Sequence, residues 1–453
     1  MRFLLTALLA SLASAQTTWI VDDTPGPGVH FTSLLAAVAA VASGDTLLVA
    51  PGHYEPFHAS GKALTILGDG HATTFIDGPL IVGMVLDYVT ITAPPVGTTF
   101  RLSGVTIRRD LPGLASRLAI AGAGVATAGT AVLTDVISEP ATMTGLSGGN
   151  GLAVTGIAVH ASRCVFRGGW FEPPTVVTVA GAGGAIVNGG ALFVADACLL
   201  SGGSPVAPAW YAFIGGGNGL TVLDATVHLT RTNLAGGSAT PLGPSSWTGG
   251  GTGLRAAGNT TVRVSGSATN SIAGGDAPVL GGFGVFSTGG PGIEAQGPAT
   301  VEVFGAIAVS GGVGFVSGPP TTGGGQIQLG LPPRPVLSLT GSAPSGGDLQ
   351  ATQPVTLGLD APTVASQLFV LVVDLAPGYF ALPGFSAEPF LLTGSASLLL
   401  VGLLDAAGQF AVTFVPATQT PEWTNLSLHL QAFAFDPALG IWQGSNAEVR
   451  RIR

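Results

Sequence analysis

The stretch Cys164-Val165-Phe166-Arg167-Gly168-Gly169 ends a short apolar strand with a pair of glycines, and the same ending recurs four times along the chain. The five pairs begin at residues 168, 202, 236, 274 and 311, so the spacings between them are 34, 34, 38 and 37 residues. Self-similarity at such a period indicates a repeat architecture, in which each unit packs on its neighbours. We therefore expect a fold built from stacked units of similar structure.

A second signal precedes each glycine pair by about half a unit. It is a glycine followed by an apolar residue that opens another short strand, and it occurs at Gly151, Gly184, Gly219, Gly253 and Gly292. One unit thus reads as strand, turn, strand, glycine pair, and then a loop rich in proline and aromatic residues. Between residues 82 and 150 short strands persist at irregular spacing, so we expect less regular coils there.

The glycines exclude a helical repeat of similar length. Each glycine inside a helix costs about 1 kcal/mol relative to alanine, whereas a coil that turns sharply at its corners needs residues without a Cβ atom. Stacked coils bury a continuous apolar interior and pair their backbone groups with the coils above and below. The repeat therefore predicts an all-β parallel β-helix over residues 16–330, with the glycine pairs at its corners.

The N-terminal part of the chain predicts a cap for this β-helix. Thr32 or Ser33 could be the N-cap of an alanine-rich helix over residues 34–42 that ends before Gly44. A strand is expected before this helix, at residues 19–23, and two more strands after it.

Three short motifs around these strands carry a resemblance to a known family. They are Gly44-Asp45-Thr46, Pro51-Gly52-His53-Tyr54 and Leu67-Gly68-Asp69-Gly70. Their order resembles the opening of the pectate-lyase-like superfamily, whose right-handed parallel β-helices begin with a capping helix. The resemblance covers about 60 residues, and it implies the fold without implying one activity.

The glycine repeat stops at a proline-rich segment. Residues 331–338 have the composition of a linker, and residues 339–453 contain alternating strands that predict a small β-sandwich. The ending Gly444-Ser445-Asn446-Ala447, with the strand after it, resembles the accessory C-terminal domains of secreted planctomycete-type bacterial proteins.

The first residues have the layout of a signal peptide. Arg2 precedes an apolar stretch at residues 3–12, and Ala13-Ser14-Ala15 supplies small residues before the expected cleavage point. We therefore expect residues 1–15 to be removed and the mature protein to be secreted or extracytoplasmic. Elsewhere the longest apolar run, Leu398 to Leu404, is too short for a membrane span.

Charge excludes one class of partner. The chain of 453 residues has a net charge of −9, a pI near 5.1 and a single lysine. Because phosphate binding needs clustered lysine and arginine, nucleic acid is not an expected partner. A polysaccharide or a cell-surface component fits better, and the sequence leaves the oligomeric state open.

The two cysteines share one position in the repeat. Cys164 and Cys198 each precede their glycine pair by four residues, so they should lie on adjacent coils. Neighbouring strands are about 4.8 Å apart, which leaves two interpretations open: a ladder of buried thiols or a disulfide. Both roles are structural.

Two histidines share another position. His160 and His228 each lie eight residues before a glycine pair, two coils apart, or about 9.6 Å. That distance is too long for one metal ion, and no metal or cofactor motif is recognisable. The first interpretation is that they face outward and simply solvate one face. The second is a polar stripe that binds a glycan, made of His160, Arg163, Asp196, His228 and Arg231.

The superfamily resemblance implies a comparison with its enzymes. Those enzymes gather several carboxylates, or two aspartates and an arginine, at one site, whereas the regular coils here carry carboxylates singly. The nearest mixed cluster is Arg108-Arg109-Asp110 with Asp135 and Glu139. We therefore expect a non-catalytic extracellular protein with a structural or glycan-binding role. The alternative is a polysaccharide lyase, glycoside hydrolase or esterase that uses this cluster.

Overall fold

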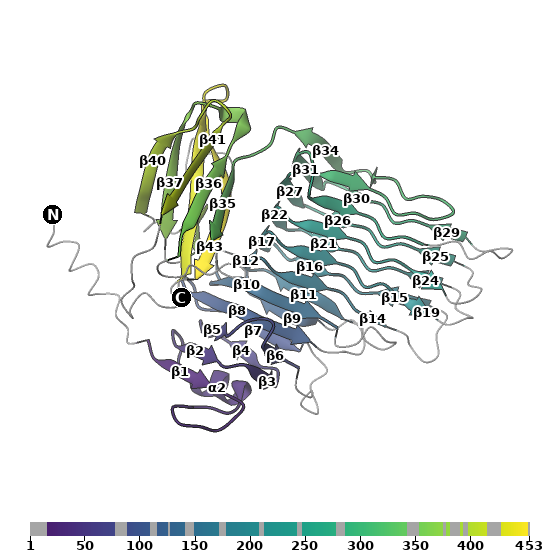
Figure 1. Ribbon diagram of the computed structural model, residues 1–453. Coiled ribbons are helices and arrows are strands. Elements are labelled where there is room, and N and C mark those ends of the chain that lie inside the picture. The colour runs from purple at the N-terminus through teal and green to yellow at the C-terminus, as the bar shows by residue number, and fades with distance from the viewer. Residues whose placement is uncertain are drawn as a thin grey trace.

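The chain winds into a stack of right-handed parallel coils, and a sandwich of antiparallel strands packs against one side of the stack (Figure 1). This confirms the predicted all-β fold. The computed structural model describes residues 16–77, 88–108, 116–125, 127–140, 149–171, 178–207, 213–241, 247–277, 286–341, 353–374, 377–380, 390–392, 397–414 and 427–451. The predicted signal peptide lies outside these residues. No helix among them is both long and apolar enough to cross a membrane.

Each coil contributes three strands to the stack. The first two lie in an 18-stranded sheet and meet at a corner, and the third lies in a 9-stranded sheet. The strands before the corner are β1 (Thr18–Val21), β2 (Thr46–Val49), β5 (Thr65–Gly68), β12 (Ala158–Ser162), β17 (Leu192–Asp196), β22 (Thr226–Thr230), β27 (Thr261–Gly266), β31 (Thr300–Gly305) and β34 (Gln326–Leu331).

The strands after the corner are β3 (Gly52–Tyr54), β6 (Thr74–Ile76), β13 (Val165–Arg167), β18 (Leu199–Ser201), β23 (Asn233–Ala235), β28 (Ser271–Ala273) and β32 (Ala308–Ser310). Two strands, β8 (Thr99–Arg108) and β10 (Thr130–Glu139), run through the corner. The 9-stranded sheet consists of β4 (His58–Ser60), β7 (Val89–Thr92), β9 (Ser116–Ala121), β11 (Asn150–Thr155), β16 (Ala185–Asn188), β21 (Leu220–Leu223), β26 (Leu254–Ala257), β30 (Ile293–Gln296) and β33 (Thr321–Thr322).

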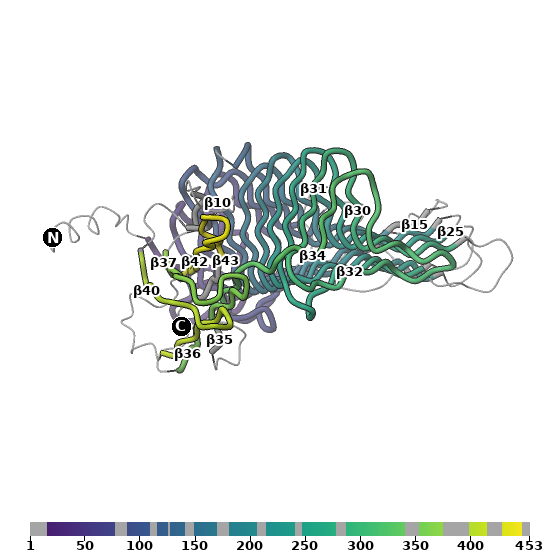
Figure 2. Tube along the Cα trace, turned by 90° about the horizontal axis from the view of Figure 1, so that it is seen from above, coloured from purple at the N-terminus to yellow at the C-terminus, as the bar shows by residue number. Residues whose placement is uncertain are grey.

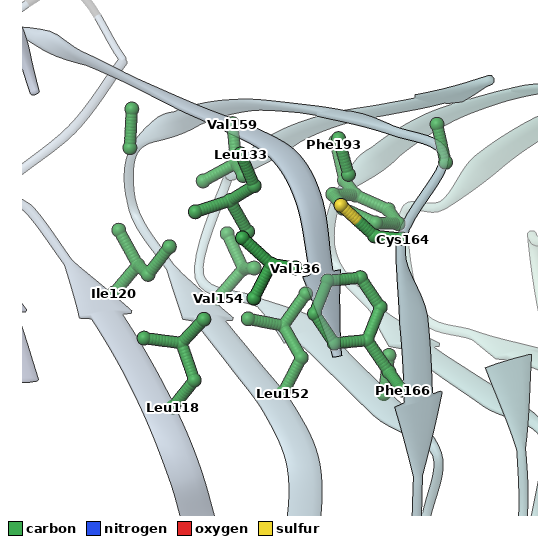
Figure 3. Close-up of a cluster of buried hydrophobic side chains, with 14 of the residues drawn as sticks. Leu118, Ile120, Leu133, Val136, Leu152, Val154, Val159, Cys164, Phe166 and Phe193 are labelled. Carbon is green, nitrogen blue, oxygen red and sulfur yellow. The ribbon is translucent and has the colours of Figure 1, made fainter. Parts of the chain in front are cut away.

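The interior of the stack is one continuous apolar core. Alternate residues of each strand point into it, as expected for strands with a period of two. Figure 3 shows a section in which Leu118, Leu133, Leu152 and Phe166, all fully buried, come together from strands of both sheets. Parallel pairing and this shared core hold the coils in register.

The first coil is closed by helix α2 (Leu34–Ala40), as predicted. The Ser33 hydroxyl accepts a hydrogen bond from the Ala36 amide, so Ser33 is the N-cap. Asp45 accepts hydrogen bonds from the Trp19 indole and from the Ala42 amide just after the helix. This carboxylate therefore fastens β1 and the end of the cap to the stack.

Single residues make the corners of the coils. Asp135, Arg163, Ala197 and Arg231 have φ angles of 49° to 54°, in the left-handed region that non-glycine residues rarely occupy. Each of them takes the place expected for a glycine. The prediction that the glycine pairs form the corners is therefore wrong.

The glycine pairs instead lie where two extended limbs of each coil meet. After β13, β18, β23 and β28 the chain leaves the stack and later returns, and the limbs of successive coils form a flat projection, the fin (Figures 1 and 2). Its strands are β14 (Trp170–Phe171), β15 (Thr178–Gly181), β19 (Val206–Ala207), β20 (Phe213–Gly215), β24 (Thr240–Pro241), β25 (Trp247–Gly249) and β29 (Phe286–Thr288).

At the base of the fin, outgoing and returning limbs alternate in one ladder of backbone hydrogen bonds of 2.7 to 2.9 Å. We call it the glycine seam, and it links, in order, Gly149, Gly169, Ala182, Gly203, Gly217, Gly237, Gly251, Gly275, Gly290, Gly312 and Gly318. A Cβ atom on Gly251 would lie 1.9 Å from the Gly217 carbonyl oxygen, and one on Gly217 would lie 2.0 Å from the Ala182 oxygen. The seam therefore needs glycine for close approach of the backbone.

Before residue 150 the coils differ in regularity: residues 69–73 separate β5 from β6 at the corner, whereas β8 and β10 run through it. β8 and β10 pair in register from Thr99–Thr130 to Arg108–Glu139, and β10 continues into β12 and β13. The sequence spacing is irregular because these coils precede the seam, which begins at Gly149, and so lack its glycine pairs.

The C-terminal strands form two antiparallel sheets. One contains β35 (Val336–Gly341), β36 (Val355–Asp360) and β41 (Gln409–Phe414), and the other contains β40 (Ser397–Leu403), β37 (Leu368–Asp374), β42 (Ser427–Asp436) and β43 (Ile441–Arg451). Two further strands, β38 (Pro377–Phe380) and β39 (Phe390–Leu392), form a short hairpin. A 3-10 turn at Pro362–Val364 follows β36. The sheets enclose their own apolar core. Residues 332–335 connect β34 to this sandwich.

The sandwich folds back along the stack. In Figures 1 and 2, β42 and β43 lie beside the middle coils, and β43 contacts β17. The Arg101 guanidinium on β8 donates a hydrogen bond of 3.0 Å to His429 Nε2 on β42. One outer face of the β-helix is therefore covered by the chain's own C-terminal part.

Candidate functional site

A row of charged side chains runs along the outer face of the strands that follow the corner. In coil order it consists of His53, Asp77, Arg108, Glu139 and Arg167, and we call it the charge ladder. The strand period places these residues outward because their neighbours Ile76, Ile107, Ser138 and Phe166 are buried inside. Stacking of coils then brings Asp77, Arg108, Glu139 and Arg167 into line. His53 is in register with Phe75 and reaches Asp77 diagonally.

Opposite charges alternate along the charge ladder. Asp77 bonds to His53 Nδ1 at 2.9 Å and to the Arg108 guanidinium at 3.0 Å. Arg108 and Glu139 are register partners, and Glu139 forms an ion pair of 2.8 Å with Arg167. Each carboxylate therefore has at least one cationic neighbour in an adjacent coil.

An aromatic surface adjoins the first part of the charge ladder. The His53 ring stacks on Phe75 with centroids 5.1 Å apart, and the Arg108 guanidinium lies 4.8 Å from the Phe75 centroid. His53 keeps 64% of its side chain exposed, against 36% for Arg108 and 46% for Arg167. Flat rings beside exposed donors and acceptors are suited to a ligand that has both apolar faces and hydroxyl groups.

The predicted catalytic cluster is only partly brought together. Arg108 and Glu139 are neighbours in the charge ladder, but Asp135 lies at a corner, where both its carboxylate oxygens bond the Arg163 guanidinium at 2.8 Å. Arg109 and Asp110 lie outside the described residues. The described members therefore do not form one catalytic group.

The predicted glycan-binding stripe does not form one site either. Arg163 is held by Asp135, while Arg231 forms two hydrogen bonds to the carboxylate of Asp196. His160 and His228 point outward from the stack, as expected, but they are only 1% and 8% exposed. The first interpretation, that they solvate one face, is wrong, because the sandwich and its connection cover that face.

Burial lowers the pKa of all three histidines in this covered region. Together with the nearby Arg163, burial lowers the pKa of His160 to about 4, and both of its ring nitrogens are without a hydrogen-bond partner. For His228, burial and the charges of Arg263 and Arg334 lower the pKa to about 3. Burial beside Arg101 also holds the pKa of His429 well below 6.5. These histidines are neutral at pH 7.

The two cysteines are buried, free and stacked on adjacent coils. The amide of Cys164 donates to the Cys198 sulfur at 3.3 Å, and the amide of Cys198 donates to the Thr232 hydroxyl at 3.3 Å. The Cys198 sulfur and the Thr232 hydroxyl therefore each accept a hydrogen bond from the amide that follows a left-handed corner residue in the previous coil. Burial raises the pKa of the Cys198 thiol, so it remains protonated and unreactive.

Ion pairing between adjacent coils extends beyond the charge ladder. In the described part of the coils, six carboxylates pair with arginine: Asp77 with Arg108, Asp135 with Arg163, Glu139 with Arg167, Asp196 with Arg231, Glu294 with Arg255 and Glu302 with Arg263. Within the same residues, no group of three His, Cys, Asp or Glu side chains is placed to hold a metal ion.

Four members of this surface are not predicted from the sequence: His53, Phe75, Asp77 and Arg167. In the sequence His53 is recognisable only as part of a fold motif, and Arg167 only as the residue before a glycine pair. A signal did exist, because Arg108, Glu139 and Arg167 end equivalent strands. The three residues could not be aligned from the sequence, because the coils of Arg108 and Glu139 have no glycine pair at the end of the strand to set the register.

Comparison with known proteins gives little similarity. No family model matches the chain, and no curated protein matches it. Among solved structures, the chain is similar to a pectin methylesterase variant in complex with a hexasaccharide. The identity is 14%, the TM-score is 0.30, and the match covers 56% of this chain and 81% of that chain.

Proposed function

We propose that this is an extracytoplasmic, non-catalytic β-helix protein that binds a polysaccharide along the charge ladder. The observation that carries the proposal is the ladder itself, an exposed row of alternating charges beside a stacked histidine and phenylalanine. The row runs along the stack, with about 4.8 Å between successive coils. An extended polymer lying on it would meet an equivalent polar group at every coil.

The charges favour a neutral polymer. Within the charge ladder Asp77 and Glu139 balance Arg108 and Arg167, so the row carries no net charge when His53 is neutral. Sugar hydroxyl groups can donate to the carboxylates and accept from the guanidinium groups at the same time. A polyanion would meet a carboxylate beside every arginine.

The same pairing argues against cleavage. Hydrolysis of a glycosidic bond requires two carboxyl groups, one of which is protonated to act as the acid. Asp77 and Glu139 are two coils apart, about 9.6 Å, which is at the upper limit of the carboxyl separation in glycosidases, and Arg108 lies between them. The two carboxylates of the ladder are thus separated by a guanidinium group, an arrangement suited to binding hydroxyl groups.

The test is calorimetric titration of the mature protein with neutral and acidic polysaccharides, with released reducing ends, methanol and unsaturated products followed in parallel. We expect binding of a neutral polymer and no product. Arg167→Met should weaken binding about tenfold or more, because a hydrogen bond to a charged group contributes about 1.5–3 kcal/mol.

Arg255→Met is the matched control. Arg255 is 43% exposed and pairs with a glutamate of an adjacent coil, as Arg167 does, but it lies on the other sheet. Equal loss of affinity in both variants would show that the polymer does not bind the charge ladder. Product formation by the wild-type protein would overturn the non-catalytic assignment.

A further inference from the structure

Like groups of the charge ladder recur on every second coil. Asp77 and Glu139 supply carboxylates two coils apart. Arg108 and Arg167, each one coil further on, supply guanidinium groups at the same interval. With about 4.8 Å between coils, each kind of group repeats about every 9.6 Å. The ladder therefore offers a polar group at every coil, but the same polar group only at every second coil.

The line of the ladder continues over the later coils without charge. The register positions that follow Arg167 on successive coils carry small side chains, half-buried or exposed: Ser201, Ala235, Ala273 and Ser310. Small side chains keep this line flat, so an extended chain bound to the ladder can continue along the stack. The alternating part runs over the four coils from Asp77 to Arg167, or about 14 Å.

A two-coil repeat distinguishes neutral polymers by their shape. When hexose rings are joined through equatorial bonds at opposite ends of each ring, successive rings turn over and the chain is a straight, flat ribbon. The ribbon repeats every two residues, and this repeat is close in length to two coils of the stack. One edge of the ribbon presents, in alternation, the ring hydroxyl groups of one residue and the hydroxymethyl group of the next.

We propose that the charge ladder binds such a ribbon, a neutral polymer of equatorially joined hexoses, with one sugar residue at each coil. The inference rests on the proposed function and adds the shape of its ligand. One kind of edge group then meets a carboxylate, to which it donates, and the other kind meets a guanidinium group, from which it accepts.

Other linkages do not keep this match. A chain with an axial bond at each ring winds into a helix, and a chain joined at positions that are not opposite on the ring curves. Either one would leave the straight row of the ladder after its first contacts, so that charged groups further along would lose their hydroxyl partners. Linkage should therefore affect affinity even when the sugar is the same.

The experiment titrates the full mature protein with neutral oligosaccharides of equal length, long enough to span the alternating coils. Cello- and manno-oligosaccharides are ribbons, malto-oligosaccharides wind into a helix, and laminari-oligosaccharides curve. We expect at least one ribbon to bind about tenfold tighter than either of the other shapes, because a mismatched chain loses at least one hydrogen bond to a charged group.

An exchange of charges tests the alternation itself. Arg108→Glu combined with Glu139→Arg keeps the net charge of the ladder but places like charges on adjacent coils, so the preference for the ribbon should be lost. The matched control is Arg255→Glu combined with Glu294→Arg, which exchanges a register pair on the other sheet and should keep the preference. If the ladder variant does not fold, the linkage preference of the wild type decides alone.

Two results would overturn this inference and leave the proposed function intact. One is equal affinity of the wild type for ribbons and for helical or curved chains. The other is a ribbon preference that survives the exchange of charges between Arg108 and Glu139. Binding of no neutral polymer at all would overturn the proposed function as well.

Discussion

Each left-handed corner at Arg163 and Ala197 is followed by a buried amide whose hydrogen-bond acceptor is a side chain of the next coil. After Arg163 the chain bends, and the amide of Cys164 finds its acceptor in the sulfur of Cys198, one coil further on. The next coil repeats the arrangement with the Thr232 hydroxyl in place of a sulfur. The requirement at this position is thus for a small side chain that accepts a hydrogen bond.

This requirement makes Cys198→Val and Cys198→Ser an informative pair. Valine fills the space but leaves the buried Cys164 amide without an acceptor, which should lower the free energy of unfolding by about 1–3 kcal/mol. Serine keeps an acceptor, as Thr232 does, and should lose less. Guanidinium unfolding followed by circular dichroism measures both. A valine variant as stable as the serine variant would contradict this role.

The sequence register alone places Cys164 over Cys198, and the structure has them there. What the sequence could not supply is their function, because periodicity locates a residue along the coil but does not give the φ angle of the residue before it. The same limit applies to Asp135 and Arg163, whose ion pair follows from a left-handed bend at both positions.

Among the elements, the glycine seam shows how a correct pattern can have an unexpected cause. The spacing of the pairs gives the repeat and hence the β-helix. The role of the glycine pairs, which is to let two limbs approach closely, was not predictable, because glycine permits both sharp turns and close backbone approach. Arg117 adds a related feature: it is fully buried and donates to the Gly149 and Arg167 carbonyl oxygens, where the seam begins.

Gly251→Ala tests the seam, with Gly249→Ala as its control. A Cβ atom on Gly251 would lie 1.9 Å from a backbone oxygen, so the limbs must separate, and we expect a loss of about 3 kcal/mol from overpacking and broken hydrogen bonds. A Cβ atom on Gly249 meets nothing within 4 Å. Its alanine variant should be neutral or slightly more stable. Similar midpoints of denaturation for both variants would contradict the close-approach explanation.

At the scale of the whole molecule, the main difference from expectation is the fold-back of the sandwich. Arg101 and His429 are 328 residues apart in sequence, and no repeat relates the two segments. Strand alternation correctly places His160 and His228 on the outside of the stack but cannot reveal that another part of the chain covers them. Arg101 lies on the docked face of the stack, and the nearby Asp374 of the sandwich is of opposite charge, which favours this arrangement.

The buried histidines predict that docking weakens in acid. The pKa of His160 is about 4 when docked and 6.5 when free, so the docked state holds fewer protons. Its contribution is complete above pH 6.5 and is lost as the pH falls from 6.5 towards 4. The loss for this residue is about 3 kcal/mol, since each pKa unit is worth about 1.4 kcal/mol. Small-angle scattering should show a larger radius of gyration near pH 4 than at pH 7.

His160→Phe should reduce this expansion, because His160 makes no hydrogen bond that phenylalanine would remove and phenylalanine cannot be protonated. His53→Phe, at an exposed histidine of the charge ladder, serves as the control and should expand like the wild type. Expansion of the His160→Phe protein equal to that of the wild type would show that another group controls docking.

The backbone construction of the glycine seam has one further consequence, for evolution and engineering. Because a ladder of main-chain hydrogen bonds links the limbs, and the side chains that support it, such as Arg117 and Asn150, lie at the junction itself, the segment between the limbs need not supply side chains to the ladder. Segments of different length and composition can therefore be exchanged there, unit by unit, without redesign of the core. The fin is a place where this protein can diversify its contacts while its coils stay the same.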